Sequence, residues 1–343
     1  MSQMTGTEQM RAVFSVCLNP SLDIAIELPV GQVLKPHALN RYRNFAVAAG
    51  GKGLNVARQL AATGLKNTLF IALPEAATGL QAYFSVEAFA TCTYRVPGEV
   101  RINLKLHEHA ASGEVQMTEL NGFGSPLERE TAADLSAMLF SSVANSNVAV
   151  FAGSLLPGIP DDIFARAAGI SRKCGGITIL DAAGQVAAPA LEKHIDIYKP
   201  NRAELAEATG LPCTSIKELA VAAAAFCRHG KVQLLLCSLG EEGAILTTGN
   251  KTFYAAVPGH SSPVLHLAGA GDAMTAALAT FAAATPPDQS FSEYLAQADL
   301  PALLRRAMAM AQATIRCRTG ETPTWEAVLD QWQRVQVEPL NLF

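Results

Sequence analysis

The sequence predicts an α/β protein whose central sheet is mostly parallel and covered by helices. In the second half of the chain, short apolar segments typical of buried strands alternate with longer segments of helical periodicity. This alternation is typical of parallel strands joined by crossover helices. We expect strands at residues 148–152, 176–180, 195–198, 232–237 and 243–246, and helices at 161–170, 203–209 and 216–229.

Length and composition agree with a large folded core. The chain has 343 residues, of which 50% are hydrophobic and 16% charged, enough for one large domain or two unequal ones. A formal net charge of -4 without any basic tract argues against a nucleic-acid partner. The seven cysteines stand singly, without metal-ligand spacing, as expected in a reducing compartment. With neither a signal-peptide pattern nor a membrane-spanning apolar run, the protein is predicted to be cytoplasmic, with no membrane partner.

The first half of the chain combines a buried strand with a glycine-lined helix entrance. The strand at 11–18 ends before Asp23, which is either a functional loop residue or a turn residue. Next, Gly50-Gly-Lys-Gly-Leu-Asn-Val-Ala57 opens a helix at about Leu54 and lacks the Gly-Lys-Ser/Thr order of a Walker P-loop. Lys52 and Asn55 suit a polyhydroxylated anionic ligand, although the glycines can also serve helix packing and Lys52 solubility.

Alternating segments follow a strand at 69–73 and a helix at 80–90. Segments 92–94, 100–106 and 115–120 are separated by Pro97-Gly98 and Ser112-Gly113, which predicts hairpins. Arg101, Asn103 and Lys105 would share one strand face. That face is either a solvated edge or a contact surface for a sugar phosphate.

Polar residues follow the later strands where parallel sheets bind ligands, at their carboxyl ends. They are Gly153-Ser154, Asp181, Lys199-Pro-Asn201 and Ser238-Leu-Gly240. Asn201 and Glu204 have the spacing of a helix capping box, and Glu204 also suits the oxygen ligation that Mg²⁺ prefers.

Ala268-Gly-Ala-Gly-Asp272 is predicted to form a turn at the N-terminus of a helix. The free N–H groups and the helix dipole make such a turn an anion site. A phosphate bound there would repel a carboxylate, so the presence of Asp272 has to be explained. One explanation is that Asp272 takes the proton from a hydroxyl that attacks a phosphoryl group. Alternatively, Asp272 is a first-turn or capping residue and the glycines only turn the chain.

Five separated motifs together resemble the ribokinase/PfkB family of carbohydrate kinases. They are Asn19-Pro-Ser-Leu-Asp23, the Gly50–Ala57 segment, Lys199-Pro-Asn-Arg-Ala-Glu204, Ser238-Leu-Gly-Glu-Glu-Gly-Ala244 and Ala268-Gly-Ala-Gly-Asp272. The resemblance narrows to the 1-phosphofructokinase and tagatose-6-phosphate kinase branch through Arg101-Ile-Asn-Leu-Lys105, Thr118-Glu-Leu-Asn121 and Gly153-Ser-Leu-Leu-Pro-Gly158. It runs from about residue 13 to residue 320.

The resemblance implies a ribokinase-like three-layer α/β/α domain with a small discontinuous β-sheet lid and an active site between them. The kinase core would comprise residues 11–23, 46–90 and 121–343, and the lid residues 24–45 and 91–120. In many relatives two lids clasp each other, so a homodimer through the lid is expected.

The resemblance also implies roles for matching residues. Asp272 would be the catalytic base, and the N–H groups of Gly269, Ala270 and Gly271 the anion hole. Substrate-binding residues would be Asp23, Gly51 and Asn55 for the sugar hydroxyls, Lys52, Arg41, Arg101 and Lys105 for its phosphate, and Asn103 on the same strand face. Cofactor contacts would come from Lys199 and Asn201 at the ATP phosphates, from Ser238, Gly240 and Gly243 in the nucleotide loop, and from Glu204 at Mg²⁺.

The implied function is an ATP- and Mg²⁺-dependent kinase for a ketohexose monophosphate, first of all fructose 1-phosphate, yielding the bisphosphate. Tagatose-6-phosphate kinase and 6-phosphofructokinase are the alternatives within the family. A sugar-phosphate sensor is the alternative outside catalysis, and it would require a lost base or anion hole. A dinucleotide-dependent oxidoreductase is disfavoured, because the Gly-x-Gly fragment lies far from the first strand. Residues 321–343 are expected to pack as a terminal helix.

Overall fold

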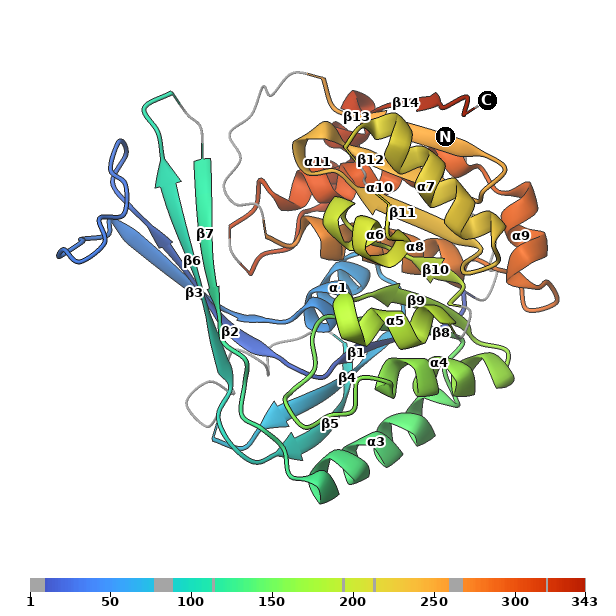
Figure 1. Ribbon diagram of the computed structural model, residues 1–343, viewed down its shortest axis with the longest axis horizontal. Coiled ribbons are helices and arrows are strands. Elements are labelled where there is room, and N and C mark those ends of the chain that lie inside the picture. Colours follow the sequence, from blue (N-terminus) through green and yellow to red (C-terminus); the bar gives the residue numbers. More distant parts are fainter. Residues whose placement is uncertain are drawn as a thin grey trace.

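The computed structural model describes residues 10–76, 89–112, 115–192, 195–211, 214–258, 268–318 and 320–342, which form a large layered body and a smaller projecting sheet (Figure 1). The body is built on a ten-stranded sheet. Its spatial order is β14 (Gln336–Pro339), β13 (Thr252–Ala256), β12 (Ala244–Thr247), β11 (Leu234–Ser238), β10 (Ile197–Tyr198), β9 (Ile177–Asp181), β8 (Val148–Ala152), β1 (Val13–Cys17), β4 (Asn67–Pro74) and β5 (Ala90–Val96).

In this spatial order, the neighbouring strands from β11 through β10, β9, β8, β1 and β4 to β5 pair in parallel. Strands β12, β13 and β14 pair antiparallel and complete one edge of the sheet. The central strands are buried along their whole length, as β8 is from Val148 to Ala152. Continuous apolar strands of this kind are typical of a sheet with helices on both faces. The mostly parallel sheet is therefore confirmed.

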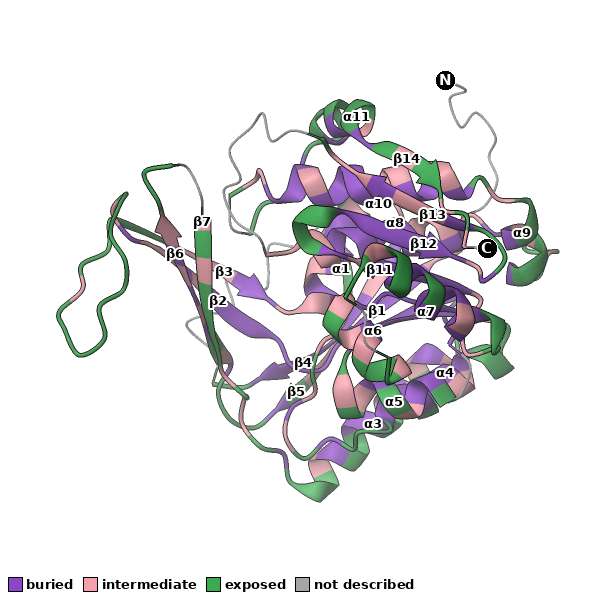
Figure 2. Ribbon diagram, turned by 45° about the horizontal axis from the view of Figure 1, so that its top comes forward, coloured by how far each residue is buried: buried purple, intermediate pink, exposed green. Residues whose placement is uncertain are grey.

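Helices cover both faces and enclose two large apolar clusters, seen as the buried interior in Figure 2. One face carries α3 (Arg129–Val143), α4 (Ile163–Lys173), α5 (Gly184–Glu192), α6 (Arg202–Thr209) and α7 (Ile216–Arg228). The other carries α1 (Lys52–Ala62), α8 (Ala270–Ala283), α9 (Phe291–Gln297), α10 (Leu300–Thr314) and α11 (Trp325–Arg334). Among the described residues, no helix is both long and apolar enough to cross a membrane.

The projecting sheet has four strands, in the order β3 (Asn44–Gly50), β2 (Ser21–Glu27), β6 (Arg101–His109) and β7 (Val115–Asn121). We call this sheet the lid. Strands β2 and β6 are parallel, whereas β3 and β7 run antiparallel to their neighbours. The loop of residues 28–43 extends from its far end and is almost entirely exposed (Figure 2).

Three expectations about the lid and its boundaries were wrong. Residues 92–94 do not form a lid hairpin, because β5 pairs in parallel with β4, where Val96 is buried in the main core. Asp23 lies on a strand and not in a loop, since β2 already begins at Ser21. Residues 46–50, expected in the core, belong to β3 of the lid. The short link of residues 18–20 carries the chain from one sheet directly into the other.

Other differences concern single elements. Helix α1 begins at Lys52, two residues before the expected start. The C-terminal helix is confirmed as α11, but the chain continues into β14, which pairs with β13 at the sheet edge. Most of the helix expected at 80–90 lies outside the described residues.

Candidate active site

The glycine turn before α8 forms as expected. Gly269 is the residue before the helix and has φ 84°, a left-handed conformation that favours glycine. The first N–H group to donate within the helix is that of Ala273, to the Gly269 carbonyl at 2.9 Å. The preceding N–H groups therefore belong to the open first turn, where the helix dipole is positive. Lys199 adds a cation, since its Nζ would lie 3.4 Å from a Cβ on Gly271.

Asp272 lies in this first turn and is buried. Its Oδ2 accepts a hydrogen bond from Asn55 Nδ2 on α1 at 2.8 Å, and the residue at the capping position is Gly269. Burial, followed by the charge of Asp181, raises the pKa of Asp272 to about 6, although Lys52, Asn55 and Lys199 act in the opposite direction. A carboxylate with a pKa near neutrality is well matched to proton transfer.

A buried ion cluster centred on Asp181 lies beside this base. Asp181 ends β9 and is completely buried. Its Oδ1 is 2.9 Å from Lys52 Nζ and 3.4 Å from Lys199 Nζ, and its Oδ2 accepts a hydrogen bond from Thr275 Oγ1 at 2.7 Å. Burial alone would raise the pKa of Asp181, but the two lysines outweigh it and lower the pKa. Asp181 also raises the pKa of Lys52, so this lysine is held as a cation next to Asp272.

Sequence reasoning missed the part played by Asp181. The sequence did show that Asp181 follows a strand at its carboxyl end. This position does not reveal which residues the carboxylate contacts. The expected phosphate ligand Lys52 forms an ion pair here, yet its side chain stays 39% exposed and so also faces solvent.

The lid contributes a second polar cluster around Asp23. Lys105 Nζ lies 2.5 Å from Asp23 Oδ2, and Oδ1 accepts hydrogen bonds from Asn103 Nδ2 at 3.0 Å and Ser21 Oγ at 2.7 Å. Strand register explains the contact, because Asp23 is directly opposite Asn103 on β6. Gly50 is needed beside it, since a Cβ there would lie 2.5 Å from the carboxylate. Asn103 and Lys105 are buried, so this face is not a solvated edge.

Arg101 lies near the base of the lid and donates to the carbonyl oxygens of Asn19 at 3.1 Å and Gly122 at 3.2 Å. It lines a cavity of about 280 Å³ together with Lys52, Asn19 and Ser154. Asp23, Lys105 and Asn55 line a smaller cavity of about 50 Å³ next to Gly269. The structure therefore places two cavities near Asp272, one with Lys52 and Arg101 in its wall and the other with Arg58 and Lys105.

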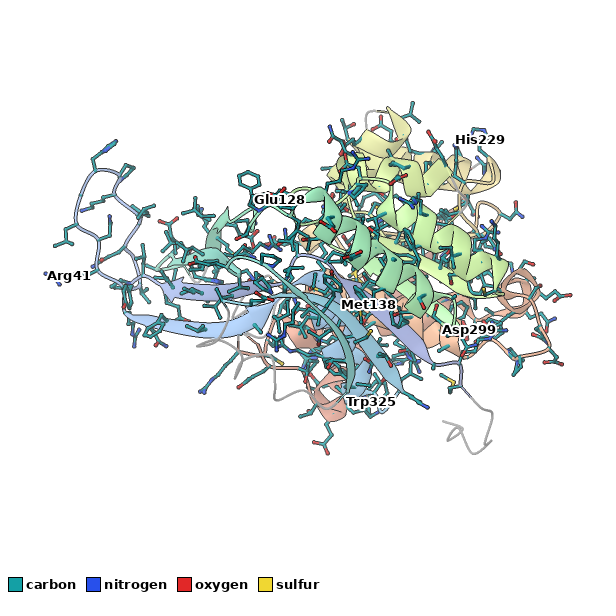
Figure 3. The ribbon with its side chains drawn as sticks, turned by 90° about the horizontal axis from the view of Figure 1, so that it is seen from below. Arg41, Glu128, Met138, His229, Asp299 and Trp325 are labelled. Atoms are coloured by element: carbon teal, nitrogen blue, oxygen red, sulfur yellow. The ribbon has the colours of Figure 1, made fainter. Side chains whose placement is uncertain are left out.

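Arg41 is not brought to this site. It is exposed on the loop of residues 28–43, which carries it away from the body (Figure 3). A basic residue near a lid strand looks alike in sequence whether the loop folds back or projects. Gly51, in contrast, is placed as expected at the entrance of α1, with φ 122° and no room for a Cβ beside Cys17 Sγ.

The residues expected at the nucleotide gather along the ends of β10 and β11. Asn201 and Glu204 form a reciprocal capping box, with Glu204 N donating to Asn201 Oδ1 at 2.9 Å and Asn201 N donating to Glu204 Oε2 at 2.8 Å. Asn201 also forms a β-bridge with Ser238. Gly240 and Gly243 both have positive φ in the turn that follows. A Cβ on Gly243 would lie 1.9 Å from the Ala255 carbonyl oxygen, so the turn requires glycine.

These residues fit the phosphates of a nucleotide better than they fit a metal ion alone. The helix N-terminus with Lys199 and Lys52 supplies donors and cations for phosphate oxygens. Across the described part of the chain, no three acidic, His or Cys residues converge as a metal site. Mg²⁺ is commonly held by one or two carboxylates plus phosphates and waters, so Glu204 suits it only with a nucleotide present.

Comparison with known proteins agrees with this geometry. Residues 18–327 match the family described as pfkB family carbohydrate kinase. The chain is 34% identical over 272 residues to the 1-phosphofructokinase of Xanthomonas campestris pv. campestris, covering 77% of this chain and 82% of the relative. It is 28% identical over 274 residues to the tagatose-6-phosphate kinase of Staphylococcus epidermidis, covering 78% and 84%. The crystal structure of phosphofructokinase-2 from Escherichia coli in complex with fructose-6-phosphate superposes with a TM-score of 0.77 at 24% identity, covering 94% of this chain and 99% of that one, which shows the shared fold. The chain belongs to the pfkB family of carbohydrate kinases.

Proposed function

We propose that this kinase transfers the γ-phosphoryl group of ATP to a hydroxyl of a ketohexose monophosphate, with fructose 1-phosphate as its preferred substrate. One observation carries the reaction type: a buried carboxylate, Asp272, stands in the open first turn of a helix with Lys199 and Lys52 nearby. The substrate choice is supported by the relatives named 1-phosphofructokinase.

Proton transfer is assigned to Asp272. The attacking hydroxyl loses its proton to Asp272. The hydrogen bond from Asn55 Nδ2 to Asp272 Oδ2 at 2.8 Å holds the carboxylate in place. The N–H groups of the α8 first turn and the Lys199 ammonium bind the phosphoryl oxygens, where negative charge develops. Bound Mg²⁺, with Glu204 as its protein acid, would supply further charge neutralisation at the phosphates.

Sugar binding is assigned to the lid and to the two cavities below it. Asp23, Asn103 and Lys105 form a ready set of donors and acceptors for sugar hydroxyls. Arg101 and Lys52 line the larger cavity and would bind the phosphate that the substrate already carries. A charged substrate group in this cavity distinguishes a sugar-phosphate kinase from a kinase for free sugars.

The test is ADP release from ATP with Mg²⁺, measured in parallel with fructose 1-phosphate, tagatose 6-phosphate, fructose 6-phosphate and free ketohexoses. We expect the highest kcat/KM with fructose 1-phosphate, and a large rise in KM for that sugar phosphate in Arg101→Met. Turnover of free sugars alone would refute the phosphate assignment. A preference for tagatose 6-phosphate would select the alternative suggested by the Staphylococcus relative.

We also propose a homodimer formed through the lid. The lid face opposite Asp23 carries Phe45, Ile102 and Leu120, which are 56%, 49% and 63% exposed. An apolar sheet face of this kind favours association with a second copy. Size-exclusion chromatography with light scattering should give a dimer, and Leu120→Glu should give a monomer; a monomeric parent protein would refute the proposal.

A further inference from the structure

A third cavity, separate from the catalytic cluster, is lined by residues of α5, α6 and α7. Its volume is about 410 Å³, within the range of small-molecule sites. We call it the acidic groove; the residues used below are Glu192, Tyr198, Glu204, Glu207, Phe226 and Lys231. Only Glu204 is shared with the residues placed at the nucleotide.

The floor of the acidic groove is aromatic. Tyr198 and Phe226 lie with ring centroids 6.1 Å apart. Tyr198 is 1% exposed, and its hydroxyl has no hydrogen-bond partner among the described residues. Buried tyrosine hydroxyls normally find such a partner, so this group is available to a bound molecule. Burial, and then the charges of Glu204 and others including Glu207, raises the pKa of Tyr198, in accord with a hydroxyl that faces these carboxylates.

The rim of the groove is negative. Glu192, Glu204 and Glu207 line it, and Lys231 is the only cation among the described lining residues. Glu192 and Glu207 form neither an ion pair nor a side-chain hydrogen bond with any described residue. Glu207 Oε1 lies 3.7 Å from the place where Gly184 would carry a Cβ, so this carboxylate reaches from α6 to the start of α5. The groove therefore favours a cation.

The same groove does not favour a bare metal ion. Among the described residues, its carboxylates do not converge closely enough to form a metal-ligand cluster. Apart from Gln185 and Lys231, the rest of its described wall has no polar side chain and includes Ala187, Leu191 and Ala208. Alkyl groups of an organic cation fit the apolar part of this wall.

We propose that the acidic groove binds a small organic cation of the alkylguanidinium type, with its charge between the carboxylates and its N–H groups donating to the Tyr198 hydroxyl. The planar guanidinium carries several N–H donors in a fixed fork, so it can donate to carboxylates and to a hydroxyl at the same time. The groove shares Glu204 with the residues assigned to Mg²⁺ and ATP, so the binding applies to the protein without nucleotide.

The experiment is isothermal titration of the full chain with n-butylguanidinium chloride, without nucleotide or sugar phosphate. n-Butylurea, which has a similar shape but no charge, is the ligand control. We expect a Kd of the order of 1 mM for the cation and no measurable binding of the urea. Equal binding of both compounds, or no binding of either, would overturn the proposal and leave the proposed kinase function untouched.

Variants locate the site. Glu207→Gln should raise the Kd about threefold to fivefold, the scale of one exposed ion pair. Tyr198→Phe should raise it about fivefold through the lost hydrogen bond, without lowering the melting temperature, because the hydroxyl has no partner to lose. Glu130→Gln makes the same change at an exposed position of α3, outside the groove, and should leave the Kd unchanged. A Kd that stays the same in both groove variants would show that the cation binds elsewhere.

Discussion

Replacing Asp272 with Asn should lower activity and raise stability at the same time. The Asn55 hydrogen bond can be kept, because the new amide oxygen accepts it in place of Oδ2. The proton acceptor is lost, so kcat should fall by at least ~10²-fold, the usual scale for a general base. A carboxyl with a pKa of about 6 in place of 3.8 has its ionised form disfavoured by roughly 3 kcal/mol in the folded protein. A neutral Asn removes most of that penalty at pH 7.

The stability gain has a defined pH dependence. The pKa of Asp272 is higher in the folded than in the unfolded protein, so ionisation destabilises the fold increasingly as the pH rises from about 4 to about 6, and by a constant amount above that. Urea unfolding at pH 4.5 and pH 7 should therefore give a small difference between variant and parent at the lower pH and the full difference at the higher one. A difference independent of pH would refute the burial argument. Near-normal kcat in ADP release would refute the role of the base.

Three further predictions concern neighbouring groups. In the parent protein, kcat should fall as the pH drops below about 6, because Asp272 gains a proton. Lys52→Met removes a cation that lowers the pKa of Asp272, so in this variant the fall in kcat should begin at higher pH. A kcat profile shifted to lower pH would contradict the assignment. Asp181→Asn leaves two lysines without their buried partner and should cost about 3–5 kcal/mol in urea unfolding, whereas a loss below about 1 kcal/mol would show that the cluster is solvated. Gly243→Ala places a Cβ 1.9 Å from a carbonyl oxygen, so the melting temperature of this variant should fall much further than that of Gly240→Ala. The Cβ in Gly240→Ala meets open space, so that variant loses only the left-handed backbone cost of about 1–2 kcal/mol. Equal losses of melting temperature would refute the steric explanation.

Local patterns predicted the elements of the core well. The apolar run at 148–152 coincides with β8, and the glycines at 269 and 271 border the start of α8. Both signals depend on neighbouring residues: side-chain periodicity for the strand and left-handed backbone for the turn. The Asn201 capping box is equally local, and it formed with both of its hydrogen bonds.

Sheet membership could not be predicted in the same way. Residues 92–94 and 100–106 have similar alternating patterns, yet β5 joins the main sheet and β6 the lid. Strand patterns specify which face is apolar but not which neighbour supplies the hydrogen bonds. The same limit hid β14, whose partner β13 lies about eighty residues earlier in the chain.

The sequence by itself determined the family-specific motifs, the α/β class and the positions of Asp272, Asn55 and Glu204 on their elements. Only the tertiary structure decided which charges meet: Asp181 with Lys52 and Lys199 in the core, and Asp23 with Lys105 in the lid. It also removed Arg41 from the site and showed the acidic groove around Tyr198. The reason is that motifs record local backbone needs, whereas ion pairs, cavities and pKa values depend on burial and distance between residues far apart in the chain.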